Sequence, residues 1–334
     1  MLFSIIIPCQ RISSCLREET IPAILKQKGA KFEIIVIPDQ QTNLGLPKTS
    51  VFPQLGSPSQ KRNLGLKKAK GEVVVFIDDD AYPSPDWLKN IAQNFKKSLK
   101  IAGLGGPGLT PPQDSFWAKI SGWFWASPLG SGGAGQYRNW PQKKRLVDDY
   151  PTFNLAVKKE VLKKIGGFSC QFWPGEDTKL CLDLVYQLGK KIIYDPKSVV
   201  FHHRRKIFLP HLKQLGRYGY HRGLFVKLFP QTSRKIGYFL PALFSIGLLL
   251  GPIFYWLLSG LNLGLWASLI SNAYLFCLGL YGVMLILNSF WVLGKSKNVA
   301  IAFLLLVVVP MSHVYYGFMF VWGLIARKDQ LKKI

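Results

Sequence analysis

Apolar residues in the first part of the chain form short runs, separated by segments rich in glycine, proline and charge. Residues 3–7, 32–37 and 73–77 are three such runs, and each contains at most one polar residue. A strand buried on both faces has a nearly continuous apolar sequence, so these runs predict strands of a parallel sheet.

The segments between and after these runs carry helix signals. The clearest is at Ser57, where a serine cap is followed by a proline in the first turn and by Gln60, placed to close a capping box. Strands and helices that alternate in this way predict an α/β domain. We expect helices over 14–28, 57–70 and 84–99.

Three later segments, 237–258, 265–293 and 299–326, are apolar over lengths that cross a hydrocarbon core of about 30 Å. Buried helices of a large soluble domain are the alternative, but such helices are seldom free of charge over this length. The sequence therefore predicts a transmembrane region at 236–334 with about three helices. Three crossings put the basic tail outside, against the positive-inside rule, so a bent or re-entrant segment around Pro310 is a second possibility.

Charge also divides the chain. Six of the 43 basic and one of the 18 acidic residues lie after residue 235, so the front part holds 37 basic and 17 acidic side chains. This balance suits nucleic acid, nucleotide phosphates or an anionic membrane surface. No recognised nucleic-acid-binding module accompanies the charge, so we expect nucleotide phosphates and membrane lipids as partners rather than nucleic acid. A homo-oligomer is also compatible with the sequence.

Three consecutive carboxylates, Asp78, Asp79 and Asp80, follow the apolar run 73–77. They are expected at the carboxyl end of a buried strand, where open α/β sheets bind ligands. Adjacent acids repel one another, and a divalent cation with oxygen ligands compensates for that repulsion. The triplet predicts a metal-bridged phosphate site, and a solvated acidic turn is the alternative.

The five cysteines, at positions 9, 15, 170, 181 and 277, show no paired spacing for zinc or for a disulfide framework. We expect them to pack as small apolar groups in a reducing compartment. The stretch 103–150 is rich in glycine, proline and tryptophan and lacks clear periodicity. It is predicted to be a functional loop or lid, whose tryptophans stack on sugar or enter the membrane interface.

Several motifs together give the chain a family resemblance over roughly residues 1–230. They are Ile5 to Pro8, Glu33 to Val36 with Asp39, Lys61 to Leu66, Gly71 to Asp80, Asn154 to Val157, Gly166 to Phe168, and Glu176 with Asp177. In this set the chain resembles the family 2 inverting glycosyltransferases. The resemblance implies a GT-A fold, a Rossmann-like domain with a mixed, mostly parallel sheet. We expect it at 1–205, followed by a basic, amphipathic membrane-proximal segment at 206–235.

The resemblance also implies roles for the residues at the sheet edge. Pro8, Asp39 and Asp79 would lie at the donor nucleotide, with Asp39 on the base or ribose. Asp78 and Asp80 would form the DxD-type site, in which Asp80 holds Mn²⁺ or Mg²⁺ on the diphosphate. The family often shows two acids after the second strand, whereas Pro38 precedes a single Asp39 here, and this leaves the choice of nucleotide open.

Arg62 and Asn63 are placed beside the nucleotide by the same resemblance. A guanidinium suits a phosphate contact because its donors form a fork. The alternative is an exposed, Lys/Arg-rich helix face that includes Lys61 and Lys67.

Glu176 and Asp177 form the second candidate centre, at the start of a predicted helix. Acids in a first helical turn are common because they favour the helix dipole. Displacement with inversion, however, needs a base that deprotonates the acceptor hydroxyl. By resemblance that base is Asp177, with Glu176 and Asn154 on the acceptor side.

A histidine at the end of a predicted strand, His202, is a candidate to complete the metal shell. Further on, the stretch from Gln214 to Tyr218 is similar to the Gln-x-x-Arg-Trp motif of processive synthases, which makes Arg217 a candidate for contacting a diphosphate. A basic cluster at a membrane surface is the alternative for this region.

Together these features predict a membrane-anchored, metal-dependent enzyme that transfers a sugar from a nucleotide-diphospho-sugar. The acceptor is expected to be lipid-linked, such as a polyprenyl phosphate or a lipid-linked glycan, because three helices hold the site at a bilayer. We expect a multi-pass protein of the plasma membrane with its catalytic domain in the cytoplasm. A processive polysaccharide synthase and a non-catalytic sugar-nucleotide-binding scaffold are the alternatives. The synthase is disfavoured because no span precedes the catalytic domain.

Overall fold

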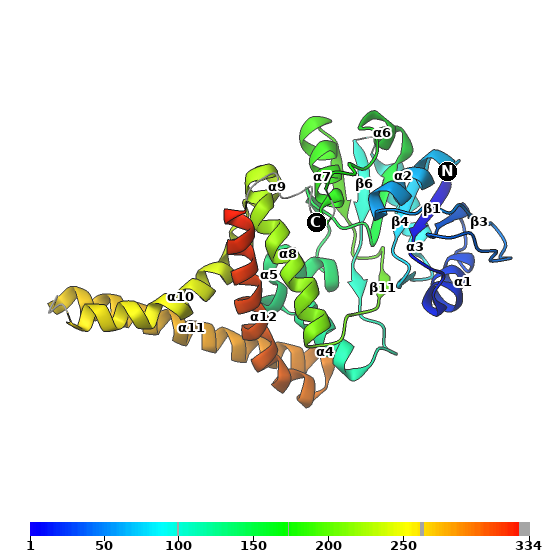
Figure 1. The fold of residues 1–334 in the computed structure, drawn as a ribbon. Helices are drawn as coiled ribbons and strands as arrows, with labels where there is room; N and C mark the ends of the chain where they lie inside the picture. Colours follow the sequence, from blue (N-terminus) through cyan, green and yellow to red (C-terminus); the bar gives the residue numbers. More distant parts are fainter. Residues whose placement is uncertain (99, 173, 261–263, 327–334) are drawn as a thin grey trace. The chain divides into compact units, whose positions relative to one another are not determined.

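The computed structural model describes residues 1–98, 100–172, 174–260 and 264–326 (Figure 1). These residues form two compact units. The first unit comprises Met1–Gln113 and Tyr137–His203. The second comprises Asp114–Gln136 and the described residues from Arg204 onward. The first unit contains the strands and almost all of the candidate site residues.

An eight-stranded sheet forms the centre of the first unit, in the order β3-β2-β1-β4-β9-β6-β10-β8. Neighbours from β3 to β4 pair in parallel, as do β6 and β10, whereas β9 is antiparallel to both of its neighbours and β8 to β10. The prediction of a mixed, mostly parallel sheet is confirmed. The strands are β1 (Leu2–Pro8), β2 (Lys31–Ile37), β3 (Thr49–Val51), β4 (Val73–Ile77), β6 (Ile101–Gly105), β8 (Arg145–Val147), β9 (Asn154–Lys158) and β10 (Lys191–Tyr194).

The central strands are buried on both faces, which explains their unbroken apolar sequences. In β4, Val73, Val75 and Ile77 join one core cluster, whereas Val74 and Phe76 join the other. The same alternation holds in β1 and β2, so side chains from each of these strands fill two cores.

Helices cover both faces of this sheet. On one face lie η1 (Leu16–Thr20), α1 (Ile21–Leu25) and α3 (Trp87–Lys97), and on the other lie α2 (Pro58–Lys68), α6 (Lys159–Lys164), α7 (Glu176–Leu182) and η2 (Asp183–Gln187). The predicted capping box at Ser57 and Gln60 is present. The helix expected over 14–28 is η1 followed directly by α1, and α3 ends at Lys97, while the predicted end at Leu99 lies outside the described residues.

A second, three-stranded sheet has the order β5-β11-β7, with β5 (Ala81–Pro83), β7 (Gly108–Leu109) and β11 (Val200–His202). It was not predicted, because strands of two or three residues leave no periodic signal. Antiparallel pairing places His202 opposite Ala81, the residue after the acidic triplet.

The prediction that 103–150 is a loop is wrong, whereas its functional role stays a prediction. This stretch contains the end of β6, β7, α4 (Phe116–Ala126), α5 (Pro128–Asn139) and β8. Apolar and aromatic residues occupy nearly every position of α4, which hides its helical period. In α5, Gly132 has φ 59°, so two helical segments meet there at a kink.

The second unit is helical. Besides α4 it contains α8 (Leu209–Leu228), α9 (Pro230–Ser233), α10 (Ile236–Gly260), α11 (Gly264–Ser296) and α12 (Val299–Ile325). In the described part of this unit, three segments are long and apolar enough to cross a membrane: Ile236–Leu257, Ser268–Ser296 and Val299–Ile325. Within this unit α12 lies along α8 (Figure 1). The last span is one continuous helix through Pro310.

Candidate active site

Candidate donor-site residues lie at the carboxyl ends of three parallel strands. Pro8 ends β1, Asp39 follows β2 and Asp78 follows β4. The strands that precede Asp39 and Asp78 are not direct neighbours, because β1 lies between β2 and β4. All three strands are parallel, so their carboxyl ends still form one edge, where ligands of open α/β sheets bind.

Asp78, Asp80 and His202 form a group whose potential ligand atoms all lie within 4.8 Å of one another. His202 Nε2 lies 3.0 Å from Asp80 Oδ1. The His202 Nδ1 atom is buried and has no partner among the described residues, so the ring meets the acids through Nε2. The two carboxylates suit Mn²⁺ or Mg²⁺, hard cations that prefer oxygen ligands, and the imidazole adds one nitrogen donor. These residues therefore fit the expected divalent cation.

Lys61 is almost fully buried and forms an ion pair with Asp39, with a distance of 2.5 Å between Nζ and Oδ1. The same ammonium donates to the backbone carbonyl of Cys9. The ends of β1 and β2 are thereby joined through the first turn of α2. The alternative of an exposed basic helix face is wrong for Lys61 and Arg62, whereas Lys67 is exposed.

Arg62 connects the two acidic centres. Its Nη1 donates to Glu176 Oε1 at 2.7 Å, and its Nη2 lies 3.3 Å from Asp78 Oδ1. Burial raises the pKa of Asp78, whereas the guanidinium of Arg62 and the ring of His202 lower it. A fork of donors can hold two carboxylates at once, which the ammonium of a lysine does less well. The sequence indicated a phosphate contact for Arg62 but not this bridge.

Asp177 lies in the first turn of α7, beside Glu176, and its Oδ1 accepts a hydrogen bond from the backbone N–H of Thr178 at 2.8 Å. Burial raises the pKa of Asp177 to about 7, and the nearby carboxylates of Glu176 and Asp149 act in the same direction. A carboxylate with a pKa near neutrality is suited to accept a proton from an alcohol.

Asp149 belongs to this centre although the sequence did not identify it. It is buried, accepts a hydrogen bond from the hydroxyl of Thr178 at 3.1 Å and pairs with Arg138 at 3.2 Å. Asp149 thus ties the start of α7 to the end of α5. Its only signal in the sequence was an acid directly before the apolar Tyr150, which is weak.

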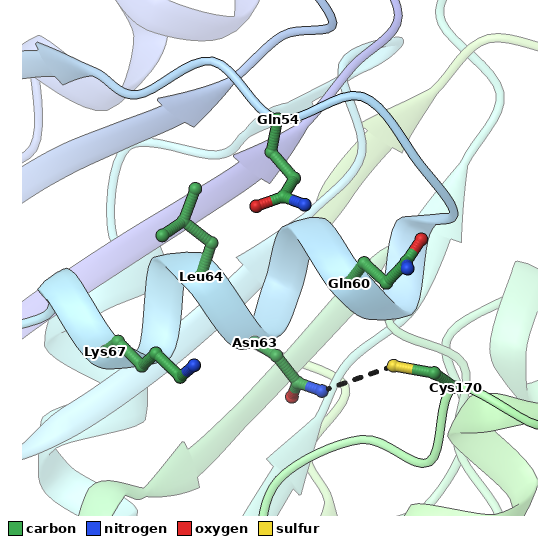
Figure 2. Close-up of a pocket in the computed structure, with 6 residues that line it drawn as sticks. All are labelled: Gln54, Gln60, Asn63, Leu64, Lys67 and Cys170. Carbon is green, nitrogen blue, oxygen red and sulfur yellow. Dashed lines mark hydrogen bonds between the residues drawn. The ribbon is translucent and has the colours of Figure 1, made fainter.

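Asn63 faces another part of the fold. Its amide exchanges two hydrogen bonds of 2.8 Å with the backbone of Phe168 and so holds the turn at Gly167 against α2. Asn63 lines a pocket of about 250 Å³ together with Gln54, Gln60, Leu64, Lys67 and Cys170, whose side chains are drawn in Figure 2. None of the candidate acids lines this pocket. The role of Asn63 at the nucleotide stays a prediction.

Asn154 is fully engaged inside the core. Its side-chain oxygen accepts from the indole N–H of Trp87, and its amide donates to the carbonyls of Gly106 and Ser198. These contacts describe a residue that joins strands, and its place on the acceptor side stays a prediction. Arg217 lies exposed on α8, in the second unit, and its role at a diphosphate stays a prediction.

The family model described as Glycosyl transferase family group 2 matches residues 73–325. The chain belongs to this family. This glycosyltransferase is 27% identical over 169 residues to a dolichyl N-acetyl-alpha-D-glucosaminyl phosphate 3-beta-D-2,3-diacetamido-2,3-dideoxy-beta-D-glucuronosyltransferase of Methanococcus voltae, covering 49% of this chain and 51% of the relative. It is 21% identical over 205 residues to a glucosyl-dolichyl phosphate glucuronosyltransferase of Haloferax volcanii, covering 55% of this chain and 63% of the relative.

The glycosyltransferase also resembles a solved structure of a mannosyltransferase from Pyrobaculum calidifontis in complex with GDP-Man and Mn²⁺. The TM-score is 0.53 at 18% identity, and the match covers 97% of this chain and 87% of the other. This likeness confirms the GT-A fold. The matches to the two curated relatives span between half and two thirds of those proteins' own lengths.

Proposed function

We propose that this glycosyltransferase is a metal-dependent inverting enzyme that transfers a sugar from a nucleotide-diphospho-sugar to a lipid-linked acceptor. The observation that carries the proposal is the bridge of Arg62 between Asp78 and Glu176. It joins the acids that suit a diphosphate and its cation to the segment that carries Asp177. A donor site and a base within one unit are what a displacement at an anomeric carbon requires.

In the proposed reaction, Asp177 accepts the proton of the acceptor hydroxyl. The hydroxyl oxygen then forms a bond to the anomeric carbon while the bond from that carbon to the diphosphate breaks, and the configuration is inverted. A divalent cation held by Asp78, Asp80 and His202 would stabilise the charge that develops on the leaving diphosphate. Pro8, Asp39, Arg62, Asn63 and Asp79 are proposed to contact the donor.

Two observations support a lipid-linked acceptor. The described residues include three helices long and apolar enough to cross a membrane, and many large apolar side chains on α10 and α11 are exposed. In addition, two relatives bear names in which the substrate is a dolichyl phosphate sugar. A polyprenyl phosphate or diphosphate that carries a glycan would bring its reactive end to the bilayer surface.

We further propose that the catalytic domain spans 1–205 on the cytoplasmic side of the plasma membrane. A membrane-proximal segment at 206–235 and the spans after residue 236 would follow it. Arg217, on α8 of that segment, would contact a diphosphate or a lipid phosphate. The family membership concerns the sugar transfer, whereas these assignments of place and topology rest on the apolar spans and on charge.

A labelling experiment tests the proposal. Membranes that contain the protein are incubated with radiolabelled nucleotide sugars and Mn²⁺, and the lipids are then extracted. The expected result is label in the lipid fraction from at least one donor, and no label with the matched Asp177→Asn membranes. Label only in a soluble glycan or a protein would refute the lipid acceptor. Long polymer as the product would identify a processive synthase, and donor binding without any transfer would identify a scaffold.

A further inference from the structure

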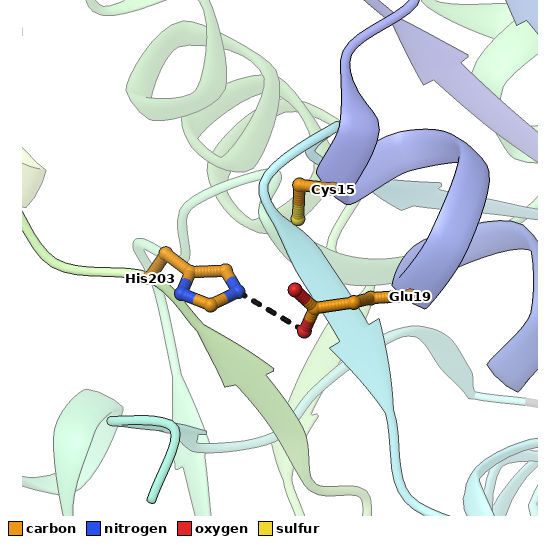
Figure 3. A group of neighbouring side chains, drawn as sticks. All are labelled: Cys15, Glu19 and His203. Carbon is orange, nitrogen blue, oxygen red and sulfur yellow. Dashed lines mark hydrogen bonds and ion pairs between the residues drawn. The ribbon is translucent and has the colours of Figure 1, made fainter. Parts of the chain in front are cut away.

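A second group of metal-binding side chains lies close to the proposed donor site. Cys15, Glu19 and His203 have ligand atoms that all lie within 4.8 Å of one another. Figure 3 shows Cys15 and Glu19 on the first helical segment and His203 just beyond β11, with the sulfur, carboxylate and ring gathered in one place. No residue of this group belongs to the Asp78, Asp80 and His202 set.

Helix spacing and hydrogen bonds hold these three residues near one another without a metal. Cys15 is the residue before η1 and Glu19 lies four residues further on, a spacing at which helical side chains are neighbours. The backbone N–H of His203 donates to the carbonyl of Asp80 at 3.0 Å, and its Nε2 lies 3.2 Å from Glu19 Oε2. The amide of Gln113 donates to the same carboxylate oxygen at 3.0 Å. Gln113 therefore holds the carboxylate of Glu19, and the carbonyl of Asp80 holds the backbone of His203.

The kinds of donor atom decide which cation fits. Thiolate, imidazole and carboxylate are ligands of Zn²⁺, and three protein ligands with one open position are common at such sites. Zinc bonds of about 2.0 to 2.3 Å in a tetrahedron place ligand atoms roughly 3.5 Å apart. His203 Nε2 and Glu19 Oε2 lie 3.2 Å apart, and all three ligand atoms of the group lie within 4.8 Å of one another. A thiolate disfavours Mg²⁺ and Mn²⁺, which prefer oxygen.

We propose that Cys15, Glu19 and His203 bind a zinc-class divalent cation, at a site chemically distinct from the oxygen-rich donor site. Binding would replace the thiol proton of Cys15, which passes to solvent, and the sulfur would bond the metal as a thiolate. A metal ligand at Cys15 would depart from the expectation that every cysteine packs as a small apolar group. The inference does not depend on the proposed sugar transfer.

Such a cation would help to fix the backbone of the acidic turn, the segment from Asp78 to Asp80. The hydroxyl of Thr20, at the end of η1, contacts the carbonyl of Asp79 at 3.5 Å. The backbone N–H of His203 donates to the carbonyl of Asp80. A metal that joins Cys15 and Glu19 to His203 would therefore link two segments that each contact the backbone of the turn. A ligand that binds only the folded state also stabilises it, so the cation would raise the thermal midpoint.

Cobalt(II) is the probe for the test, because a cobalt–thiolate bond gives a charge-transfer band in the near ultraviolet. We expect the detergent-purified full chain to develop this band, to saturate at one Co²⁺ with sulfur ligation per chain, and to lose it when Zn²⁺ is added. Cys15→Ala should abolish the band. Glu19→Gln and His203→Asn should weaken Co²⁺ binding by at least roughly tenfold, as the loss of a metal ligand does.

Two matched variants serve as controls. Cys170→Ala removes an exposed cysteine outside the group, and Asp80→Asn removes a ligand of the other site, so both should keep the band. Circular dichroism of the metal-free proteins establishes whether each variant is folded. Absence of the band in the wild type, its survival in Cys15→Ala or its loss in Cys170→Ala would overturn the proposal. If Cys15→Ala does not fold, the isosteric Glu19→Gln decides, and unchanged Co²⁺ affinity in that variant overturns the proposal.

Discussion

Arg62 and Glu176 form a buried ion pair across 114 residues of sequence, with 2.7 Å between Nη1 and Oε1. Only 6% of the Arg62 side chain and 8% of the Glu176 side chain are exposed. In such a pair the partners have given up hydration, so the loss of one leaves an unpaired charge in the interior. The position of α7 and the charge of Asp78 both depend on the same guanidinium.

Replacing Arg62 by alanine should therefore damage both folding and activity. We expect Arg62→Ala to lower the free energy of unfolding by about 3 to 5 kcal/mol, the usual cost of removing one partner of a buried pair. Sugar transfer should fall with it, because the two acidic centres lose their common partner. Thermal unfolding of the purified protein and a transfer assay measure the two effects.

Lys67→Ala on the same helix is the control, because Lys67 is exposed. Its free energy of unfolding should stay within about 0.5 kcal/mol of the wild type. The double variant Arg62→Ala, Glu176→Gln should lose less than the sum of the two single variants, because the ion pair between Arg62 and Glu176 is then lost only once. Equal stability of Arg62→Ala and Lys67→Ala would contradict the interpretation.

The pH dependence of transfer should follow Asp177, whose pKa burial raises to about 7. A base must be deprotonated to act, so kcat/KM should rise with pH through about 7 and then level off. Asp149→Asn removes one of the carboxylates that raise this pKa, so it should move the rise to lower pH. A profile flat from pH 5 to 8, measured with saturating cation, would exclude Asp177 as the base.

Asp177→Asn should abolish transfer, with a loss on the order of 10² to 10⁴ in kcat, the usual contribution of a general base. The raised pKa also predicts the effect on folding. A carboxyl whose folded pKa lies above its unfolded value loses its stabilising contribution as pH rises from about 4 to 7. The neutral asparagine avoids this loss, so the variant should be at least as stable as the wild type at pH 8. The Asp177→Asn variant should still bind the nucleotide-sugar donor, as measured by calorimetry.

Much of this site could be predicted because strand ends carry it. The apolar run from Val73 to Ile77 predicts a strand that is buried on both faces. Asp78 directly follows this run, so it lies at the carboxyl end of the strand, where ligands bind. The capping box at Ser57 fixed the start of α2, and the helical period placed Lys61 and Arg62 in its first turns. Each of these signals is local, so a single sequence contains it.

The remaining features depend on contacts between distant segments. Nothing near Arg62 in the sequence indicates Glu176, and nothing near Cys15 indicates His203, because only the folded chain brings each pair together. The short strands β5, β7 and β11 exist only as partners of one another, so the ladder that brings His202 to the acids is also non-local. Helix α4 was missed because its apolar residues surround the helix on all sides.

Removal of divalent cations should stop transfer reversibly. Chelation by EDTA is expected to abolish activity and added Mn²⁺ to restore it, because the leaving diphosphate needs a cation to stabilise its charge. Asp80→Asn should raise the Mn²⁺ concentration needed for half-maximal activity by at least roughly tenfold, whereas Asp86→Asn, on an exposed carboxylate, should not change it. Full activity in EDTA, after prior dialysis against the chelator, would remove the metal from the mechanism.

Within the helical unit, the contact of α8 with α12 depends on glycine. A Cβ atom added at Gly223 would lie 2.1 Å from the backbone carbonyl oxygen of Phe320, and such an atom cannot move aside cheaply. Gly223→Ala should therefore push the two helices apart and lower the free energy of unfolding by about 1 to 3 kcal/mol, as overpacking does. Gly279→Ala in α11 is the matched control, because its added Cβ meets nothing within 4 Å. We expect the thermal midpoint of the detergent-purified protein to fall for Gly223→Ala and to stay unchanged for Gly279→Ala. Equal midpoints for both variants would show that the helices do not pack this closely.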